Sequence, residues 1–309
     1  MTASELPANG MTQTASSPFL LLAAFFAAIL MSAALLFAVQ PMFTKMVLPR
    51  LGGAAAVWSV AMVFFQTTLL AGYAYAHLLT RFASRRGSVL IHLALLLIAC
   101  FALPLHLADG WGQPPSRGVA FWLLGLFAAS IGLPFFALAA NGPLMQAWFV
   151  RTDHPAARDP YFLFAASNVG SFLALISYPT VVEPFLRLRE QTWLWTVGFY
   201  VLILLIAASG ALLLRSANVS PAVATARSEA PPTWRDRVAF VGLAAVPSAL
   251  LLAVTLHIST DAAAVPMFWV VPLALYLLTF VIAFQSRPVI THAFVVKAFP
   301  FVIVLWLRS

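Results

Sequence analysis

The sequence predicts an all-α protein, a polytopic bundle of about nine transmembrane helices, from three observations. Of the 309 residues, 62% are hydrophobic and only 8% are charged. The mean hydropathy is +0.96, whereas a soluble domain carries about 25% charged residues. The apolar residues also gather in runs of about 20, the number that crosses a bilayer at a helical rise of 1.5 Å per residue. This composition excludes a soluble enzyme, a disordered chain and a secreted disulfide scaffold.

Eight long apolar runs define the expected spans. They are Phe19–Val39, Val57–Leu79, Ser88–Leu107, Val119–Ala140, Tyr161–Val182, Trp193–Leu214, Val238–Ile258 and Val265–Phe284. A ninth run, Ala293–Leu307, is shorter and contains Lys297 and Pro300. The first run is too long for a signal-peptide core and follows a tail without Lys or Arg, so we expect an uncleaved helix.

These runs divide the chain into four regions. We expect a polar N-terminal tail at 1–17 and a six-span bundle at 18–214. A flexible loop at 215–237, rich in Ala, Pro and Ser, then leads to a three-span start of a second bundle at 238–309.

The basic residues predict the orientation in the membrane. A net charge of +8 in a soluble chain would suggest nucleic-acid binding, but here the basic residues are spread thinly between apolar runs. Cytoplasmic loops are enriched in Lys and Arg. With the N-terminus inside, the inside segments hold ten basic residues and the outside segments hold six. We therefore expect a cytoplasmic N-terminus, an inner (plasma) membrane location, the lipid bilayer as surroundings and no nucleic-acid partner.

Two expected spans contain helix breakers. The uncharged stretch 119–150 includes Gly132-Leu-Pro134 and Asn141-Gly-Pro143, which predict a kinked helix followed by a short interfacial or re-entrant segment. Breaks are buried or line a cavity, which makes Asn141 a candidate binding residue. In the fifth span, small residues around Asn168 favour close helix packing, with ligand contact as the alternative. Pro184 is expected to end that helix.

The first and seventh spans carry a weak internal repeat. Ser32–Lys45 and Ser248–Asp261 match at five of fourteen positions, and Lys45 and Asp261 fall at equivalent ends. The layout of six spans, a long loop and further spans is similar to that of the major facilitator superfamily. We hypothesise that Lys45 and Asp261 form an ion pair closing the outer side of a central cavity. The alternative is that both are interfacial side chains that reach water.

Other polar side chains in the spans are candidates for binding. Gln66 lies in mid-span and must find an internal partner, because an unsatisfied amide in hydrocarbon is costly. Glu183 could attract a polyamine or metal cation, or be a solvated carboxylate at a helix end. His257 and Asp261 are four residues apart and could bind a cation or relay a proton. No two histidines have the spacing of metal ligands, so no metal site is expected.

Three separated stretches resemble a known family. They are Gln40–Gly53 with Val57-Trp58 and Phe64–His77; Asp159–Tyr161 with Ser167–Ser171, Tyr178-Pro179 and Glu183-Pro184; and Ser259–Asp261 with Pro266, Trp269 and Pro272–Tyr276. Together they resemble the membrane region of bacterial multi-spanning spermidine-synthase-like proteins. This resemblance implies a major-facilitator-like six-helix half plus an incomplete second half, in a bacterial inner membrane. His77 lies in the first stretch and is a candidate binding residue.

The resemblance also implies a cytoplasmic synthase-like domain, for which the sequence has no counterpart. It lacks a Gly-rich strand-to-helix turn for a nucleoside cofactor and paired acidic residues for a polyamine amine. We therefore expect no enzymatic activity and no cofactor. The chain is interpreted either as a fragment of a longer protein or as a shorter relative that works with a synthase-like partner.

Two functions follow from these expectations. The leading one is a membrane module that transports or binds a small cationic or amphipathic solute. The alternative is a non-transporting anchor for a synthase-like domain or partner, or an inactive fragment. A transporter needs a water-accessible central cavity lined by Gln66, Asn168 and His257, whereas an anchor can be packed shut.

Overall fold

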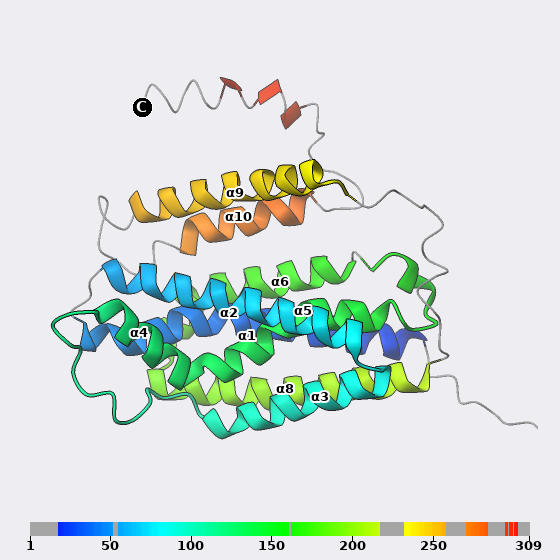
Figure 1. Cartoon of the computed structure of the whole chain (residues 1–309), viewed down its shortest axis with the longest axis horizontal. Coiled ribbons are helices and arrows are strands. Elements are labelled where there is room, and N and C mark those ends of the chain that lie inside the picture. The colour runs from blue at the N-terminus through cyan, green and yellow to red at the C-terminus, as the bar shows by residue number, and fades with distance from the viewer. Residues whose placement is uncertain are drawn as a thin grey trace, which may run out of the picture.

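The computed structural model of the protein describes residues 18–51, 55–160, 162–216, 232–257 and 270–283, with a few positions between 294 and 301. All regular structure in these residues is helical (Figure 1). The helices are α1 (Pro18–Val47), α2 (Ala55–Phe82), α3 (Arg85–Ala99), α4 (Val119–Phe127), α5 (Leu133–Phe149), α6 (Phe162–Ser177), α7 (Glu183–Phe185), α8 (Leu188–Arg215), α9 (Trp234–His257) and α10 (Val270–Ala283). Short helical segments extend several of them: η1 (Leu48–Arg50), η2 (Cys100–Ala102), η3 (Ala128–Gly132), η4 (Pro155–Arg158) and η5 (Tyr178–Val182).

Within the described residues, seven helices are long and apolar enough to cross a membrane. They are Pro18–Arg50, Ser59–Phe82, Arg85–Ala102, Val119–Phe149, Phe162–Phe185, Leu188–Arg215 and Trp234–Val254. Each coincides with one of the first seven apolar runs, so the prediction of a multi-pass helical membrane protein is confirmed. The helix in the eighth run, α10, has 14 residues, which corresponds to about 21 Å. The ninth run lies mostly outside the described residues, and a count of nine spans stays a prediction.

The re-entrant segment expected after the fourth span is wrong. α4, η3 and α5 form one continuous helical stretch of 31 residues, and Pro143 lies inside α5. The break predicted at Gly132-Leu-Pro134 does occur, as the π-helical turn η3. Proline cannot donate to the carbonyl four residues earlier, and a widened turn just before Pro134 accommodates this loss. The second breaker is tolerated because its helix is enclosed by neighbours.

The fifth span also continues past its expected end. α6 runs through a second π-helical turn, η5, into α7, so that Pro184 lies within the helix. The helix ends at Phe185, after which Leu186 is extended. Pro184 therefore lies next to the last helical residue instead of terminating the helix itself.

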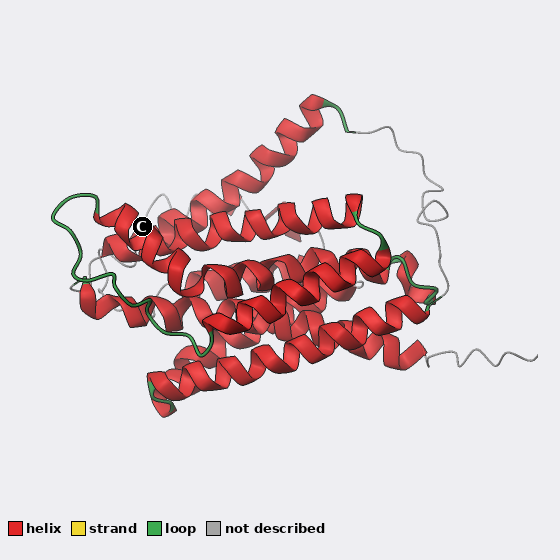
Figure 2. Cartoon of the chain, turned by 60° about the horizontal axis from the view of Figure 1, so that its bottom comes forward, coloured by secondary structure: helices red, strands yellow, loops and turns green. Residues whose placement is uncertain are grey.

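α1 is the centre of a six-span bundle, which we call the six-helix bundle (residues 18–215). It packs against α6, α8 and α5, while α2 packs on α5, and α3 lies against α8 and α5. The long helices run side by side along one axis (Figures 1 and 2). A Cβ added at Gly170 of α6 would collide with the backbone carbonyl of Leu30 in α1. This contact confirms the close packing predicted from the small residues of the fifth span.

The interior of the six-helix bundle is filled by aromatic side chains. Phe127 packs edge-on against Phe43 and Phe65, at ring-centroid distances of 5.0 and 5.6 Å. Phe135 lies 4.8 Å from Phe65, and all four rings are buried. Such ring pairs contribute about 0.5–1.5 kcal/mol each beyond their buried area. The core is therefore packed with side chains that leave little room for a solute.

Outside the six-helix bundle, α10 packs on α6, and α9 contacts α10. Ala274 and Leu277 of α10 form a small buried cluster with Leu175 of α6. Figure 1 shows α9 and α10 side by side beyond α6. The second group of helices therefore adds to the six-helix bundle on the α6 side.

Candidate functional site

The first group of candidate residues lies where α1 ends, which we call the Lys45 end of the six-helix bundle. The Lys45 ammonium lies 2.6 Å from Glu183 Oε1, with the two side chains 43% and 26% exposed. Because α1 and α6 pack together, residues 138 apart in the chain meet at one end. Glu183 is therefore an ion-paired residue, which corrects its interpretation as a solvated carboxylate.

The partner expected for Lys45, Asp261, lies outside the described residues. The carboxylate of Glu183 has a second oxygen, Oε2, that is buried and has no hydrogen-bond partner among the described residues. A buried carboxylate oxygen can accept further hydrogen bonds from a cation. Glu183 thus combines one satisfied oxygen with one buried oxygen that accepts no hydrogen bond from the described residues.

The second group lies in the middle of the six-helix bundle and consists of Asn141, His92 and Ser32. His92 Nε2 lies 2.6 Å from Asn141 Oδ1, and Asn141 Nδ2 donates to Ser32 Oγ at 3.0 Å. Ser32 Oγ in turn donates to the carbonyl of Leu138 at 3.4 Å. Asn141 and His92 are fully buried, so these bonds link α1, α3 and α5 inside the membrane region.

This chain of hydrogen bonds has a direction. The Asn141 oxygen can only accept, so His92 carries its proton on Nε2, and its Nδ1 is the unprotonated nitrogen. Nδ1 is buried and has no partner within the described part of the chain, and the same holds for the hydroxyl of Tyr75. The Tyr75 ring lies 6.0 Å from the His92 ring. The network therefore ends at the unsatisfied Nδ1 of His92, beside a tyrosine ring whose hydroxyl is also unsatisfied.

A further buried bond strengthens the same helices. Trp148 of α5 donates from Nε1 to Ser88 Oγ of α3 at 2.8 Å, one helical turn from His92.

His92 itself was not among the candidate residues. A histidine in mid-span implies a polar partner, but the identity of that partner depends on how α3 and α5 face each other.

Two candidates on α2, Gln66 and His77, face away from the bundle. Both are exposed, which contradicts the prediction that Gln66 finds an internal partner. The reason is the helical phase of α2. Phe64, Phe65 and Ala76 are buried against the bundle, and a residue two positions after Phe64 lies on the opposite side.

The remaining candidates among the described residues, Asn168 and His257, lie on different helices. Asn168 is half-buried on α6, and its side chain has no hydrogen bond within the described residues. His257 is exposed at the last residue of α9, and its expected partner Asp261 is not among the described residues. Gln66, Asn168 and His257 thus lie on three different helices, and none of them lines the pocket described below. Nor do the described residues contain a group of three His, Cys, Asp or Glu side chains that could hold a metal ion.

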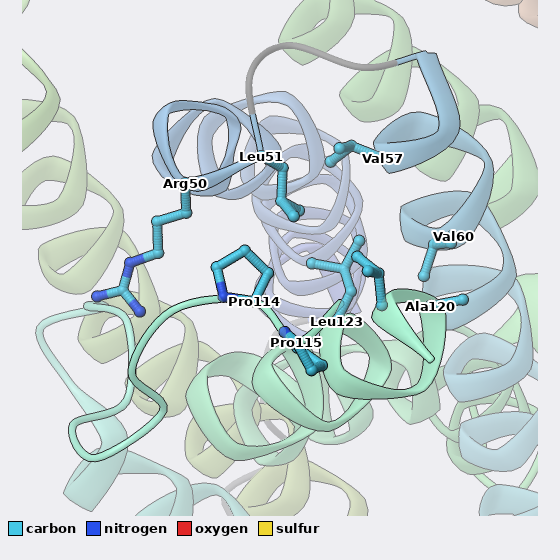
Figure 3. Close-up of a pocket in the computed structure, with 9 residues that line it drawn as sticks. Arg50, Leu51, Val57, Val60, Pro114, Pro115, Ala120 and Leu123 are labelled. Carbon is cyan, nitrogen blue, oxygen red and sulfur yellow. The ribbon is translucent and has the colours of Figure 1, made fainter. Parts of the chain in front are cut away.

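A pocket of about 440 Å³ lies at the Lys45 end, between η1, α2 and the loop before α4. Figure 3 shows its apolar walls, with Arg50 at the edge as the charged residue. Its lining consists of Arg50, Leu51, Val57, Val60, Pro114, Pro115, Val119, Ala120 and Leu123. None of the candidate binding residues belongs to this lining.

The opposite end of the six-helix bundle, which we call the Arg151 end, is held differently. Arg151 donates to the carbonyl of Thr80 at 2.7 Å, near the end of α2. Arg85 donates to the carbonyls of Leu213 and Ser216, at the end of α8. Arginine at a helix C-terminus satisfies carbonyls that have no partner in the helix and interacts favourably with the helix dipole. These arginines therefore tie α3 to α8 and α5 to α2.

No family model, no curated protein and no solved structure matches the chain.

Proposed function

We propose that the chain is a non-transporting membrane anchor whose six-helix bundle is closed and rigid. The observation that carries this proposal is the separation of Gln66, Asn168 and His257, the side chains that a central cavity would require. The buried aromatic rings occupy the interior in which a solute would move. A closed bundle of this kind holds other protein parts at a membrane without passing anything through.

The contacts between helices also support a rigid module. The hydrogen bonds of Asn141 connect three helices at the buried centre. At Gly170 the backbones of α1 and α6 approach so closely that a side chain would not fit. Transport by alternating access requires helices or bundles to rock against one another. Within the six-helix bundle, these contacts oppose such motion.

The cargo of the anchor is proposed from the motif resemblance. We propose a synthase-like domain or partner on the cytoplasmic side of a bacterial inner membrane. With the N-terminus inside, the Arg151 end faces the cytoplasm, where Arg81, Arg86 and Arg215 are exposed. The enzymatic activity would then belong to the partner.

A flux measurement tests the anchor proposal. The full chain is reconstituted into lipid vesicles, its folding is checked by cooperative thermal unfolding, and uptake of labelled spermidine is followed. We expect uptake no faster than in protein-free vesicles, with or without a proton gradient. Saturable, protein-dependent uptake would overturn the proposal.

Thiol labelling tests the closed interior separately. In a Cys100→Ala background, Ser32→Cys places a thiol in the buried network, and Asp109→Cys places one in an exposed loop as a control. We expect a membrane-impermeant maleimide to label only the loop position, whether or not spermidine is present. Labelling at position 32 that changes with spermidine would indicate a solute pathway instead.

Binding of a small cationic solute at Glu183 is a second candidate function. It is favoured by the buried Oε2 atom, which has no partner in the described part of the chain. A diamine or polyamine could donate to this oxygen beside Lys45, or replace Lys45 as the partner of the carboxylate. The Glu183→Gln variant keeps the shape of the side chain and removes its charge. Calorimetric titration should show that spermidine binds the parent protein, and that its affinity falls at least tenfold in this variant. Equal affinities of the two proteins for spermidine would exclude the site.

A further inference from the structure

Five arginines gather where α2, α3 and α8 meet at the Arg151 end of the six-helix bundle. Arg85 and Arg151 donate to backbone carbonyls near the ends of α8 and α2, and they lie close enough to interact electrostatically. Three further arginines of the same helices are exposed: Arg81 on α2, Arg86 on α3 and Arg215 on α8. Because Arg85 joins the start of α3 to the end of α8, all five lie around one corner of the bundle. We call these five residues the basic corner.

The charge of the basic corner is not balanced by the chain itself. Asp153 is the carboxylate that interacts with Arg85, and its Oδ1 already accepts a hydrogen bond from Ser216 Oγ at 2.6 Å. The three exposed arginines form no ion pair within the described residues. Outside those residues the chain carries as many acidic as basic side chains, namely Glu5, Glu229 and Asp261 against Arg227, Arg287 and Arg308. These parts of the chain therefore add no net negative charge that could neutralise the corner.

Apolar side chains are exposed directly beside these arginines. The Arg81 guanidinium lies over the ring of Phe82, 5.4 Å from its centroid, and that ring is itself exposed. Leu90 and Leu214 are exposed within one helical turn of the other two exposed arginines. In a membrane such side chains face acyl chains, whereas arginines at the ends of spans reach the headgroup level. The corner thus places positive charge where the apolar surface of the bundle ends.

We propose that the basic corner binds the headgroup of an anionic phospholipid from the leaflet at this end. The acyl chains of that lipid lie against the exposed apolar side chains next to the corner. A planar guanidinium can bind a phosphate group through two parallel hydrogen bonds, and basic clusters at the ends of membrane spans attract anionic headgroups. The lipid joins α2, α3 and α8 from outside. This role goes beyond the anchor function and does not depend on what the bundle anchors.

Lipid titration of the full chain in neutral detergent tests this proposal. Phosphatidylglycerol is added to the lipid-depleted protein, and its binding is followed by the rise in unfolding temperature and by native mass spectrometry of the bound lipid. One variant neutralises the exposed arginines of the corner, and a matched control removes the same charge from exposed arginines at the Lys45 end. The substitutions are Arg81→Gln, Arg86→Gln and Arg215→Gln in the first, and Arg50→Gln, Arg117→Gln and Arg189→Gln in the control.

We expect phosphatidylglycerol to stabilise the parent protein and the control, and its affinity to fall at least tenfold in the corner variant. Without lipid, all three proteins should unfold at the same temperature, because the changed side chains are exposed. Phosphatidylcholine, whose headgroup has no net charge, should bind the parent at least tenfold more weakly. Equal losses of affinity in both variants, or equal binding of the two lipids, would overturn the proposal. Stabilisation by inorganic phosphate to the same extent would assign the corner to a soluble anion and overturn it as well.

Discussion

The middle of the six-helix bundle and its Lys45 end are both held by polar side chains, but in different surroundings. In the middle, Asn141 and His92 are fully excluded from solvent and bonded across three helices. At the Lys45 end, the ion pair with Glu183 leaves the lysine 43% exposed. A partly exposed ion pair contributes little because water screens it, whereas losing one partner of a buried bond leaves the other unsatisfied. We therefore expect stability to depend on the neutral network more than on the charges.

The largest effect is expected from Gly170→Leu, which tests the packing of the middle. The added side chain meets the backbone carbonyl of Leu30, which cannot move without displacing α1. We expect the free energy of unfolding in detergent to fall by about 3 kcal/mol or more. Gly242→Leu on α9 is the control, since its added side chain meets no neighbour within 4 Å. Equal losses in the two variants would show that close packing at Gly170 is not responsible.

The second effect concerns the buried network. Asn141→Leu removes the acceptor of His92 and the donor to Ser32, and should lower the free energy of unfolding by about 1–3 kcal/mol. Gln66→Leu makes the same chemical change on the outward face of α2 and should have no such effect in monomeric detergent samples. The double variant Asn141→Leu with His92→Phe should lose less stability than the two single variants lose together. In Asn141→Leu the imidazole of His92 is already without its partner, so removing that imidazole costs little more. Full additivity would contradict the coupling of these residues.

The third effect belongs to the Arg151 end. Arg151→Met keeps the aliphatic stem but removes the donor to the Thr80 carbonyl, and should cost about 1 kcal/mol. Arg86→Met, at an exposed arginine of the same end, is the matched control and should be neutral. Thermal unfolding of both variants measures the difference. A loss shared by both would point to a general effect of net charge.

The smallest effect is expected at the Lys45 end. Lys45→Met removes the ion pair with Glu183 and should destabilise by about 0.5 kcal/mol at low salt, and by less at 1 M salt because the charges are screened. Arg50→Met is the control, since Arg50 is exposed near the same end. A loss above that of Asn141→Leu would reverse the comparison between the two regions.

The sequence predicts the helices of this protein better than the partners of its side chains. Apolar runs marked the first seven spans because bilayer thickness dictates their length. Small residues around Gly170 marked a real close contact. Helix breakers were predicted in the right places, and the helix that contains Pro184 ends one residue later, at Phe185. Pro143, in contrast, did not interrupt its helix, because neighbours in a bundle compensate for one lost hydrogen bond.

Side-chain partners were harder to predict because they depend on helix rotation. Gln66 was expected to face inward because it is polar. The rotation of α2 is instead set by the burial of Phe64 and Phe65, which places Gln66 on the outward side of the helix. Lys45 was assigned a partner by comparing two spans, whereas the structure pairs it with Glu183 through the packing of α1 on α6. Asn141 was named for its helix break, and its bond to His92 required knowing that α3 and α5 are neighbours.

The central position of α1 has a consequence for how the protein is made. α1 is synthesised well before α6 and α8, two of its main neighbours. The 138 residues between Lys45 and Glu183 take roughly 7 to 28 seconds to translate at about 5–20 residues per second. Ser32 of α1 likewise lacks its native partner, Asn141, until 109 further residues have been synthesised. The first span must therefore wait in the bilayer or at the insertion machinery, and its marked hydrophobicity makes such waiting possible.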